Sequence, residues 1–92
     1  MKKENNTKSI RVSSIKISQE FQSTMPKSDK LAAKYDYTKN RIRINKKYGV
    51  NRKIFQSPIV LDKRNNLSDG YTSYLIAKMF GIKKVDVMIR EN

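Results

Sequence analysis

The residues best suited to bind phosphate form a basic run between Lys39 and Lys53. No Asp or Glu occurs between Asp36 and Asp62, so nothing nearby in the sequence offsets this positive charge. Lysine and arginine bind nucleic-acid phosphates without regard to base sequence, and tyrosine can stack on bases. We predict a nucleic-acid or partner-binding surface; the alternative is a solvated basic hairpin without a partner. The predicted surface residues are Lys39, Arg41, Arg43, Lys46, Lys47, Tyr48, Arg52 and Lys53.

A second candidate is the turn around Gly70, just before a predicted helix. The free N–H groups at a helix N-terminus bind phosphate, and glycine lets the ligand approach the backbone. Lys78, Lys83 or Lys84 could add charge to such a site. The alternative is structural, with an Asp that caps the helix and a Gly that relieves a tight corner. The residues of this possible nucleotide or phosphate turn are Asp69, Gly70, Thr72 and Ser73.

Catalytic chemistry has few candidates in this sequence. The chain contains no Cys and no His, which excludes thiolate sites and histidine bases. Asp36, Asp62 and Asp69 are the only mid-chain acids that could hold Mg²⁺ or act as a base. Acids beside a turn more often serve to form that turn. We therefore expect binding rather than catalysis, and we predict no catalytic residue and no metal site.

The whole chain is small and strongly basic. It has 92 residues, with 21 Lys and Arg against 8 Asp and Glu, and a formal net charge of +13. Such a charge favours a polyanionic partner, although basic composition also arises by drift in AT-rich genomes. No segment approaches the roughly 20 apolar residues of a membrane span, and the N-terminal lysines precede no apolar signal core. We expect a cytoplasmic protein without a membrane partner.

The elements that position these residues can be predicted from hydrophobic periodicity. We expect a flexible basic arm over residues 1–8 and a single domain over residues 9–92. Within Ser9–Ile17 the alternation predicts one strand, or two strands with a bend at Ser13-Ser14. A loop is expected over Glu20–Met25, and Pro26 and Ser28 predict a helix from about Lys27 to Tyr37.

The alternation in Arg41-Ile42-Arg43-Ile44 predicts a strand with both isoleucines facing inward, and Tyr48-Gly49 predicts a turn. The last third of the chain is the most regular. It predicts an α/β fold (α+β in a stricter scheme) with a small mixed sheet and two main helices. Its predicted elements are a strand at Ile59–Leu61, a turn at Lys63–Asn66, a return strand at Leu67–Ser68, a helix at Tyr71–Phe80, a left-handed cap at Gly81 and a strand at Val85–Ile89.

Four segments of this region resemble the ParB/sulfiredoxin superfamily pattern P-I-V-V-D, D-G-x-H-R-Y-x-A-A, L-G and V-P-V. They are Pro58-Ile59-Val60-Leu61-Asp62, Asp69-Gly70-Tyr71-Thr72-Ser73-Tyr74, Phe80-Gly81 and Val85-Asp86-Val87. The resemblance implies a ParB N-terminal-like domain whose Gly-centred turn holds nucleotide phosphates, with CTP in ParB-type domains and ATP in sulfiredoxins. The motif's His and Arg correspond to Thr72 and Ser73, so a charge-assisted contact of roughly 1.5–3 kcal/mol is missing. Sulfiredoxin chemistry needs a Cys that this chain lacks.

The function that we predict is nucleic-acid binding without catalysis. The chain would contact DNA or RNA, or a nucleic-acid-binding protein, as a monomer or a homodimer. Its shortness and charge suit a protein encoded by a plasmid or phage. One alternative is an inhibitor of a host defence nuclease, similar to an anti-CRISPR protein, that acts through its basic face. The other is a CTP- or ATP-dependent switch or enzyme, with Mg²⁺, at the turn Asp69–Ser73; apart from that case we expect no cofactor.

Overall fold

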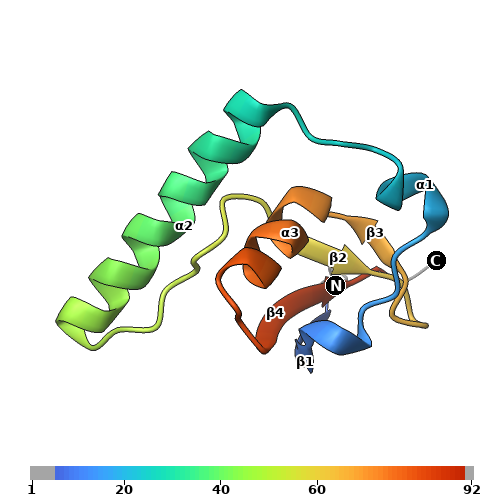
Figure 1. Ribbon diagram of the computed structural model, residues 1–92. Coiled ribbons are helices and arrows are strands. Elements are labelled where there is room, and N and C mark those ends of the chain that lie inside the picture. Colours follow the sequence, from blue (N-terminus) through green and yellow to red (C-terminus); the bar gives the residue numbers. More distant parts are fainter. Residues whose placement is uncertain (1–5, 91–92) are drawn as a thin grey trace, which may run out of the picture.

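A four-stranded mixed sheet with helices packed on it is the framework of the protein (Figure 1). The computed structural model describes residues 6–90. The strand order is β1-β4-β2-β3; β4 runs antiparallel to β1 and parallel to β2, and β3 returns antiparallel to β2. The predicted α/β class, with a small mixed sheet and two main helices, is confirmed. The elements are β1 (Asn6–Arg11), the 3₁₀ helix η1 (Val12–Ser14), α1 (Gln19–Gln22), α2 (Ser28–Tyr48), β2 (Ile59–Leu61), β3 (Leu67–Asp69), α3 (Tyr71–Met79) and β4 (Lys84–Ile89).

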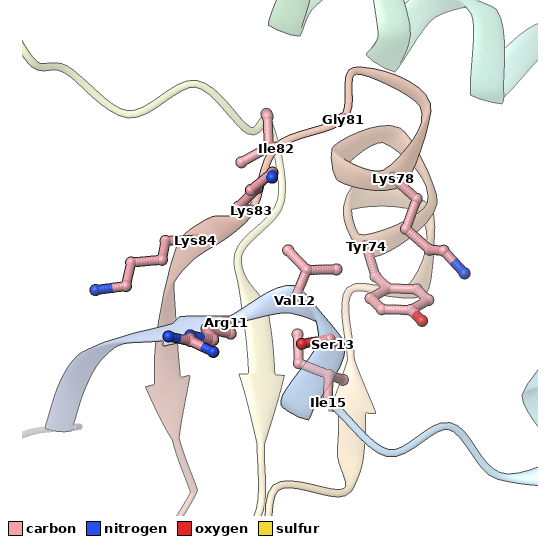
Figure 2. A pocket seen from close by; sticks show the side chains of 10 residues that line it. All are labelled: Arg11, Val12, Ser13, Ile15, Tyr74, Lys78, Gly81, Ile82, Lys83 and Lys84. Atoms are coloured by element: carbon pink, nitrogen blue, oxygen red, sulfur yellow. The ribbon is translucent and has the colours of Figure 1, made fainter.

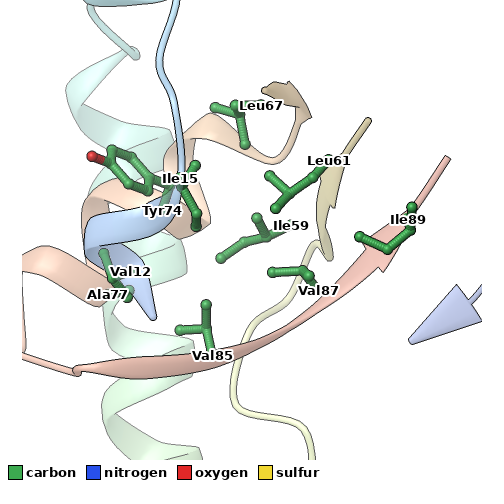
Figure 3. Packing of buried hydrophobic residues seen from close by; sticks show 10 residues of the cluster. All are labelled: Val12, Ile15, Ile59, Leu61, Leu67, Tyr74, Ala77, Val85, Val87 and Ile89. Atoms are coloured by element: carbon green, nitrogen blue, oxygen red, sulfur yellow. The ribbon is translucent and has the colours of Figure 1, made fainter. Parts of the chain in front are cut away.

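The core lies between one face of this sheet and the layer formed by α3 and η1 (Figure 3). Alternate residues of β4 and β2 point into it, as their spacing predicts for strands with one buried face. Each buried aliphatic side chain of this kind contributes roughly 1.5–3 kcal/mol. The core cluster contains Val12, Ile15, Ile59, Leu61, Leu67, Tyr74, Ala77, Val85, Val87 and Ile89.

The last third of the chain folds as predicted. The strand Ile59–Leu61 is confirmed, and the return strand, the helix and the last strand each match to within a residue. Gly81 takes the left-handed conformation, with φ of 69°. These boundaries were predictable because Gly, Asp and Asn at them act through local backbone chemistry.

The largest difference from the sequence prediction is the length of α2. This helix continues to Tyr48, so a helix end at Tyr37 and a strand over Arg41–Ile44 are wrong. Four alternating residues are too few to distinguish the two-residue period of a strand from the 3.6-residue period of a helix. Lysine and arginine favour a helix. The helix ends at Gly49, which is left-handed with φ of 63°.

The N-terminal elements follow the prediction less closely. The predicted bend at Ser13-Ser14 coincides with η1. The arm predicted for residues 1–8 lies partly outside the described residues, and its residues 6–8 belong to β1. The loop predicted for Glu20–Met25 begins inside α1, where the Ser18 hydroxyl accepts a hydrogen bond from the Phe21 N–H at 3.2 Å. The prediction overlooked this serine as a helix N-cap.

Candidate nucleic-acid interface

The helical course of α2 divides the basic run into separate groups. Lys39, Arg43, Lys46 and Lys47 are all exposed, and their spacing of four, seven and eight residues places them on one face. Arg43 also reaches along this face, where its Nη2 donates to the Asn40 side-chain oxygen at 2.8 Å. We call these four basic residues the α2 basic face.

Arg41 does not belong to the α2 basic face. Residues two apart on a helix lie about 160° from each other around its axis, so Arg41 and Arg43 point to different sides. The Arg41 guanidinium carbon lies 5.2 Å from the centre of the Tyr37 ring. The strand prediction had placed both arginines on one outward face, and the helix corrects this.

Arg52 and Lys53 also lie away from the α2 basic face, in the segment that returns from the end of α2. The Asn45 side chain holds this segment, because its Nδ2 donates to the Arg52 carbonyl at 2.9 Å and its Oδ1 accepts from the Arg52 N–H at 3.3 Å. Both basic residues line a hollow of about 640 Å³ beside β4. Tyr48, at the end of α2, is 65% exposed and remains available for stacking.

Besides the Asn45 hydrogen bonds, two side-chain contacts attach α2 to the body of the molecule. The Tyr35 ring stacks on the Phe80 ring at 4.7 Å, and Lys34 Nζ donates to the Ser57 hydroxyl at 3.1 Å. Both partners on α2 lie in its first half. The second half extends away from the sheet (Figure 1), so the α2 basic face projects from the body of the molecule.

The turn at Gly70 has a structural reason for its glycine. Its φ is 85°, and a Cβ atom there would lie 2.2 Å from the Pro58 carbonyl oxygen and 2.8 Å from the Ile59 Cα. The Gly70 N–H already donates to the Asp69 carboxylate at 2.8 Å. Packing of the turn against the start of β2 therefore accounts for this glycine without a ligand.

Ser73 is not placed to bind a ligand in this structure. It is 1% exposed, and its hydroxyl donates to the Ser57 carbonyl oxygen at 2.6 Å. Thr72, its neighbour, is partly exposed. The residue at the position of the superfamily's arginine thus joins α3 to the segment before β2.

The Gly70 turn also receives no positive charge from Lys78, Lys83 and Lys84. They lie at or beyond the C-terminal end of α3, whereas Gly70 precedes its N-terminus. A helix of this length separates its ends by roughly 13 Å. The three lysines instead line a hollow with Arg11, a residue that the sequence prediction did not single out.

Asp62 forms the turn between β2 and β3. Its Oδ1 accepts from the Arg64 N–H at 2.8 Å and the Asn66 N–H at 2.9 Å, while Oδ2 accepts from Asn66 Nδ2 at 3.1 Å. Asn65 completes the turn with φ of 68°. The Asn66 backbone and side-chain hydrogen bonds, aided by the Arg64 N–H and charge, lower the pKa of Asp62 below its ordinary 3.8. No group of three or more acids, histidines or cysteines within residues 6–90 could hold a metal ion.

We expect Asp62→Ala to destabilise the protein at neutral pH and to matter less in acid. A carboxylate whose pKa is lowered by folding stabilises the fold above its unfolded pKa, and this contribution is lost as the pH falls through the folded pKa. Urea denaturation between pH 7 and pH 2.5 measures the free energy of unfolding of the unchanged protein and of the variant. The difference between the two free energies should shrink below about pH 4.5. A constant difference would show that the charged carboxylate does not hold the turn.

No protein-family model and no curated protein matches the sequence. Solved structures do match the fold. Two structures of a pNOB8-like ParB N-domain are 21% identical over 97% of this chain, covering 31% and 29% of their own chains, with TM-scores of 0.60 and 0.57. A C-terminally truncated chromosome-partitioning protein ParB from Caulobacter crescentus, complexed with CTP-γ-S, is 16% identical over 95% of this chain and 45% of its own, with a TM-score of 0.60.

These similarities define an α/β protein with a ParB N-domain-like fold, built on the four-stranded mixed sheet. The fold that the sequence resemblance implies is thereby confirmed. The chain spans less than half of the length of the ParB structures that it matches. Among residues 6–90, no helix has both the length and the apolar character needed to cross a membrane.

Proposed function

We propose that this protein binds nucleic acid through the α2 basic face without catalysing a reaction. The observation that supports the proposal is the row of four exposed cations on a helix that projects from the body. Asp36 is the nearest acid along the helix, and it precedes the row. Phosphate contacts from such a row are independent of base sequence, so affinity should depend strongly on salt.

The exposed end of α2 adds a stacking residue to this face. Lys47 Nζ lies 5.4 Å from the centre of the Tyr48 ring, and Tyr48 as a residue is 65% exposed. An exposed aromatic beside cations is the combination with which proteins bind single-stranded segments, where stacking contributes roughly 1–3 kcal/mol per base. The proposal therefore includes Tyr48 as the residue that would contact a base.

We expect the combined substitution Lys39→Gln, Arg43→Gln, Lys46→Gln and Lys47→Gln to weaken DNA or RNA binding at least about 100-fold at 100 mM salt. Glutamine keeps the helix propensity and removes the charge. The slope of log affinity against log salt should also fall by about 3–4 on duplex DNA. Fluorescence anisotropy with labelled duplex and single-stranded oligonucleotides, from 50 to 300 mM salt, measures both quantities.

The matched control removes four charges elsewhere, with Lys16→Gln, Lys27→Gln, Lys30→Gln and Lys63→Gln. These lysines are exposed and lie outside the α2 basic face. Equal losses in both variants would show that net charge alone governs binding, and the α2 basic face would have no special role. Undetectable binding of the unchanged protein at 50 mM salt would end the proposal.

A protein partner is the second candidate, in line with an inhibitor that covers a nuclease surface. It is favoured by apolar side chains exposed near the end of α2, where Ile44 and Val50 are each 37% exposed. Retention of a host protein after nuclease treatment and at 300 mM salt would support this candidate over nucleic acid. Neither proposal depends on whether a plasmid or phage encodes the chain. Neither proposal requires a nucleotide-dependent switch at the Gly70 turn.

A further inference from the structure

A basic hollow lies at the end of the sheet where β1 ends and β4 begins (Figure 2). Its volume is about 960 Å³. Four of the residues that line it are cationic and none is an acid. The hollow is lined by Arg11, Val12, Ser13, Ile15, Tyr74, Lys78, Gly81, Ile82, Lys83 and Lys84.

The register of the sheet forces two of these cations together. Arg11 and Lys84 are direct partners across the antiparallel pair β1–β4. Like charges at directly opposed positions destabilise a sheet. No acid lines the hollow to compensate them. Asp86 lies two residues further along β4 on the same exposed face, so it offsets part of this repulsion, and a bound anion would offset more of it.

The other two cations are held nearby by separate elements. Lys83 precedes β4, and its carbonyl accepts a hydrogen bond from the Val12 N–H at 2.9 Å, which ties η1 to this corner. Lys78 comes from the last turn of α3, with its Nζ 5.5 Å from the centre of the Tyr74 ring. Figure 2 shows the Lys84 and Lys78 ammonium groups on opposite sides of the hollow, so the four cations surround it rather than meet at one point.

The floor of the hollow is apolar. Val12 and Ile15 are buried core residues, Tyr74 is 9% exposed, and Ile82 packs against the same core. A volume of several hundred Å³ with an apolar floor and a few polar groups is typical of small-ligand sites. The corner offers room for an apolar or aromatic group beside charges suited to phosphate.

We propose that this hollow binds a ligand with closely spaced phosphate groups, through Arg11, Lys83, Lys84 and Lys78. Such phosphates could belong to a free polyphosphate, including a nucleotide, or to a nucleic-acid strand. The site is separate from the α2 basic face and lies at the opposite end of α3 from the Gly70 turn. It stands whether or not α2 binds nucleic acid.

The test uses inorganic tripolyphosphate as the probe, at constant ionic strength, with the full chain. Tripolyphosphate at ten times its dissociation constant should raise the melting temperature by about 5–10 °C. In Arg11→Gln with Lys84→Gln, affinity measured by calorimetry should fall at least about tenfold. The control Lys27→Gln with Lys30→Gln, which removes two exposed charges from the start of α2, should bind as the unchanged protein does.

The same variant reports on the repulsion in the empty site. Without any anion and at low salt, Arg11→Gln with Lys84→Gln should melt no lower than the unchanged protein, because the opposed charges are gone. If it fails to fold, Lys78→Gln with Lys83→Gln replaces it, since neither of these residues belongs to a strand. Absence of a shift in the unchanged protein, or equal affinity in variant and control, overturns the proposal.

Two further ligands separate the sources of phosphate. ATP and a single-stranded oligothymidylate are titrated into protein that carries the four α2 substitutions, with and without Arg11→Gln and Lys84→Gln. A loss confined to ATP assigns the hollow to free polyphosphates, and a loss confined to the oligonucleotide assigns it to a strand. If neither loses affinity, the hollow does not recognise phosphate in these ligands and the proposal fails.

Discussion

Replacing Gly70 with alanine should destabilise the protein by about 2–5 kcal/mol. A non-glycine residue in the left-handed region costs roughly 1–2 kcal/mol. The new Cβ would also lie 2.2 Å from the Pro58 carbonyl oxygen and 2.8 Å from the Ile59 Cα, both backbone atoms. The start of β2 must therefore move, and it carries a core residue, so overpacking adds roughly 1–3 kcal/mol.

Gly49→Ala is the matched control for this prediction. Gly49 has φ of 63°, and a Cβ atom there meets nothing within 4 Å. It should cost only about 1–2 kcal/mol, the conformational part alone. The difference between the two variants in urea denaturation isolates the steric part. Equal losses of unfolding free energy in the two variants would mean that the Gly70 turn can accommodate a side chain. Gly70 would then have no packing role.

Replacing Ser73 with arginine should unfold the protein or destabilise it by at least about 4 kcal/mol, rather than create a nucleotide site. The residue is 1% exposed and lies against the Ser57 backbone. A guanidinium there would lose its hydration without a carboxylate partner, and a buried unpaired charge is among the most costly changes known. The superfamily motif alone predicts the reverse, a gain of phosphate binding.

Two controls separate charge from position at this turn. Ser73→Ala removes one hydrogen bond and should cost about 1–2 kcal/mol. Thr72→Arg places the same charge on the partly exposed neighbour and should fold normally. Circular dichroism with urea, and thermal shift with CTP and ATP in the presence of Mg²⁺, measure the outcomes. A stable Ser73→Arg protein that binds either nucleotide would contradict the structural role of Ser73.

The elements after Ile59 could be predicted from the sequence because each boundary has a local chemical cause. Asp62, Gly70 and Gly81 each act within a few residues of themselves, through a carboxylate that accepts turn N–H groups or through a positive φ. The alternation in β4 then follows from one buried face. Local rules of this kind need no knowledge of the rest of the chain.

The end of α2 could not be predicted in the same way. Its second half contains Arg41-Ile42-Arg43-Ile44, which fits a short strand as well as a helix with a mostly exposed surface. Packing does not decide the matter there, because that half has little contact with the core. The sequence did carry one usable signal: no Gly or Pro interrupts the chain between Pro26 and Gly49.

The basic hollow could not be predicted from the sequence, for a different reason. Arg11 and Lys84 meet only because β1 pairs with β4, and almost the whole described chain separates the two strands. The alternation around Arg11 indicates an outward side chain but not its neighbour. Charge clusters formed by non-local strand pairing become visible only once the sheet order is known.

The pairing of β1 with β4 also governs how the fold could be joined to other proteins. Asn6 lies directly opposite Ile89, so the described chain enters and leaves the sheet at one place. Adjacent entry and exit points are what allows a domain to be inserted into a surface loop of another protein, or to be circularly permuted. A short glycine linker across these two strand ends would join them without a change in the register of β1 and β4.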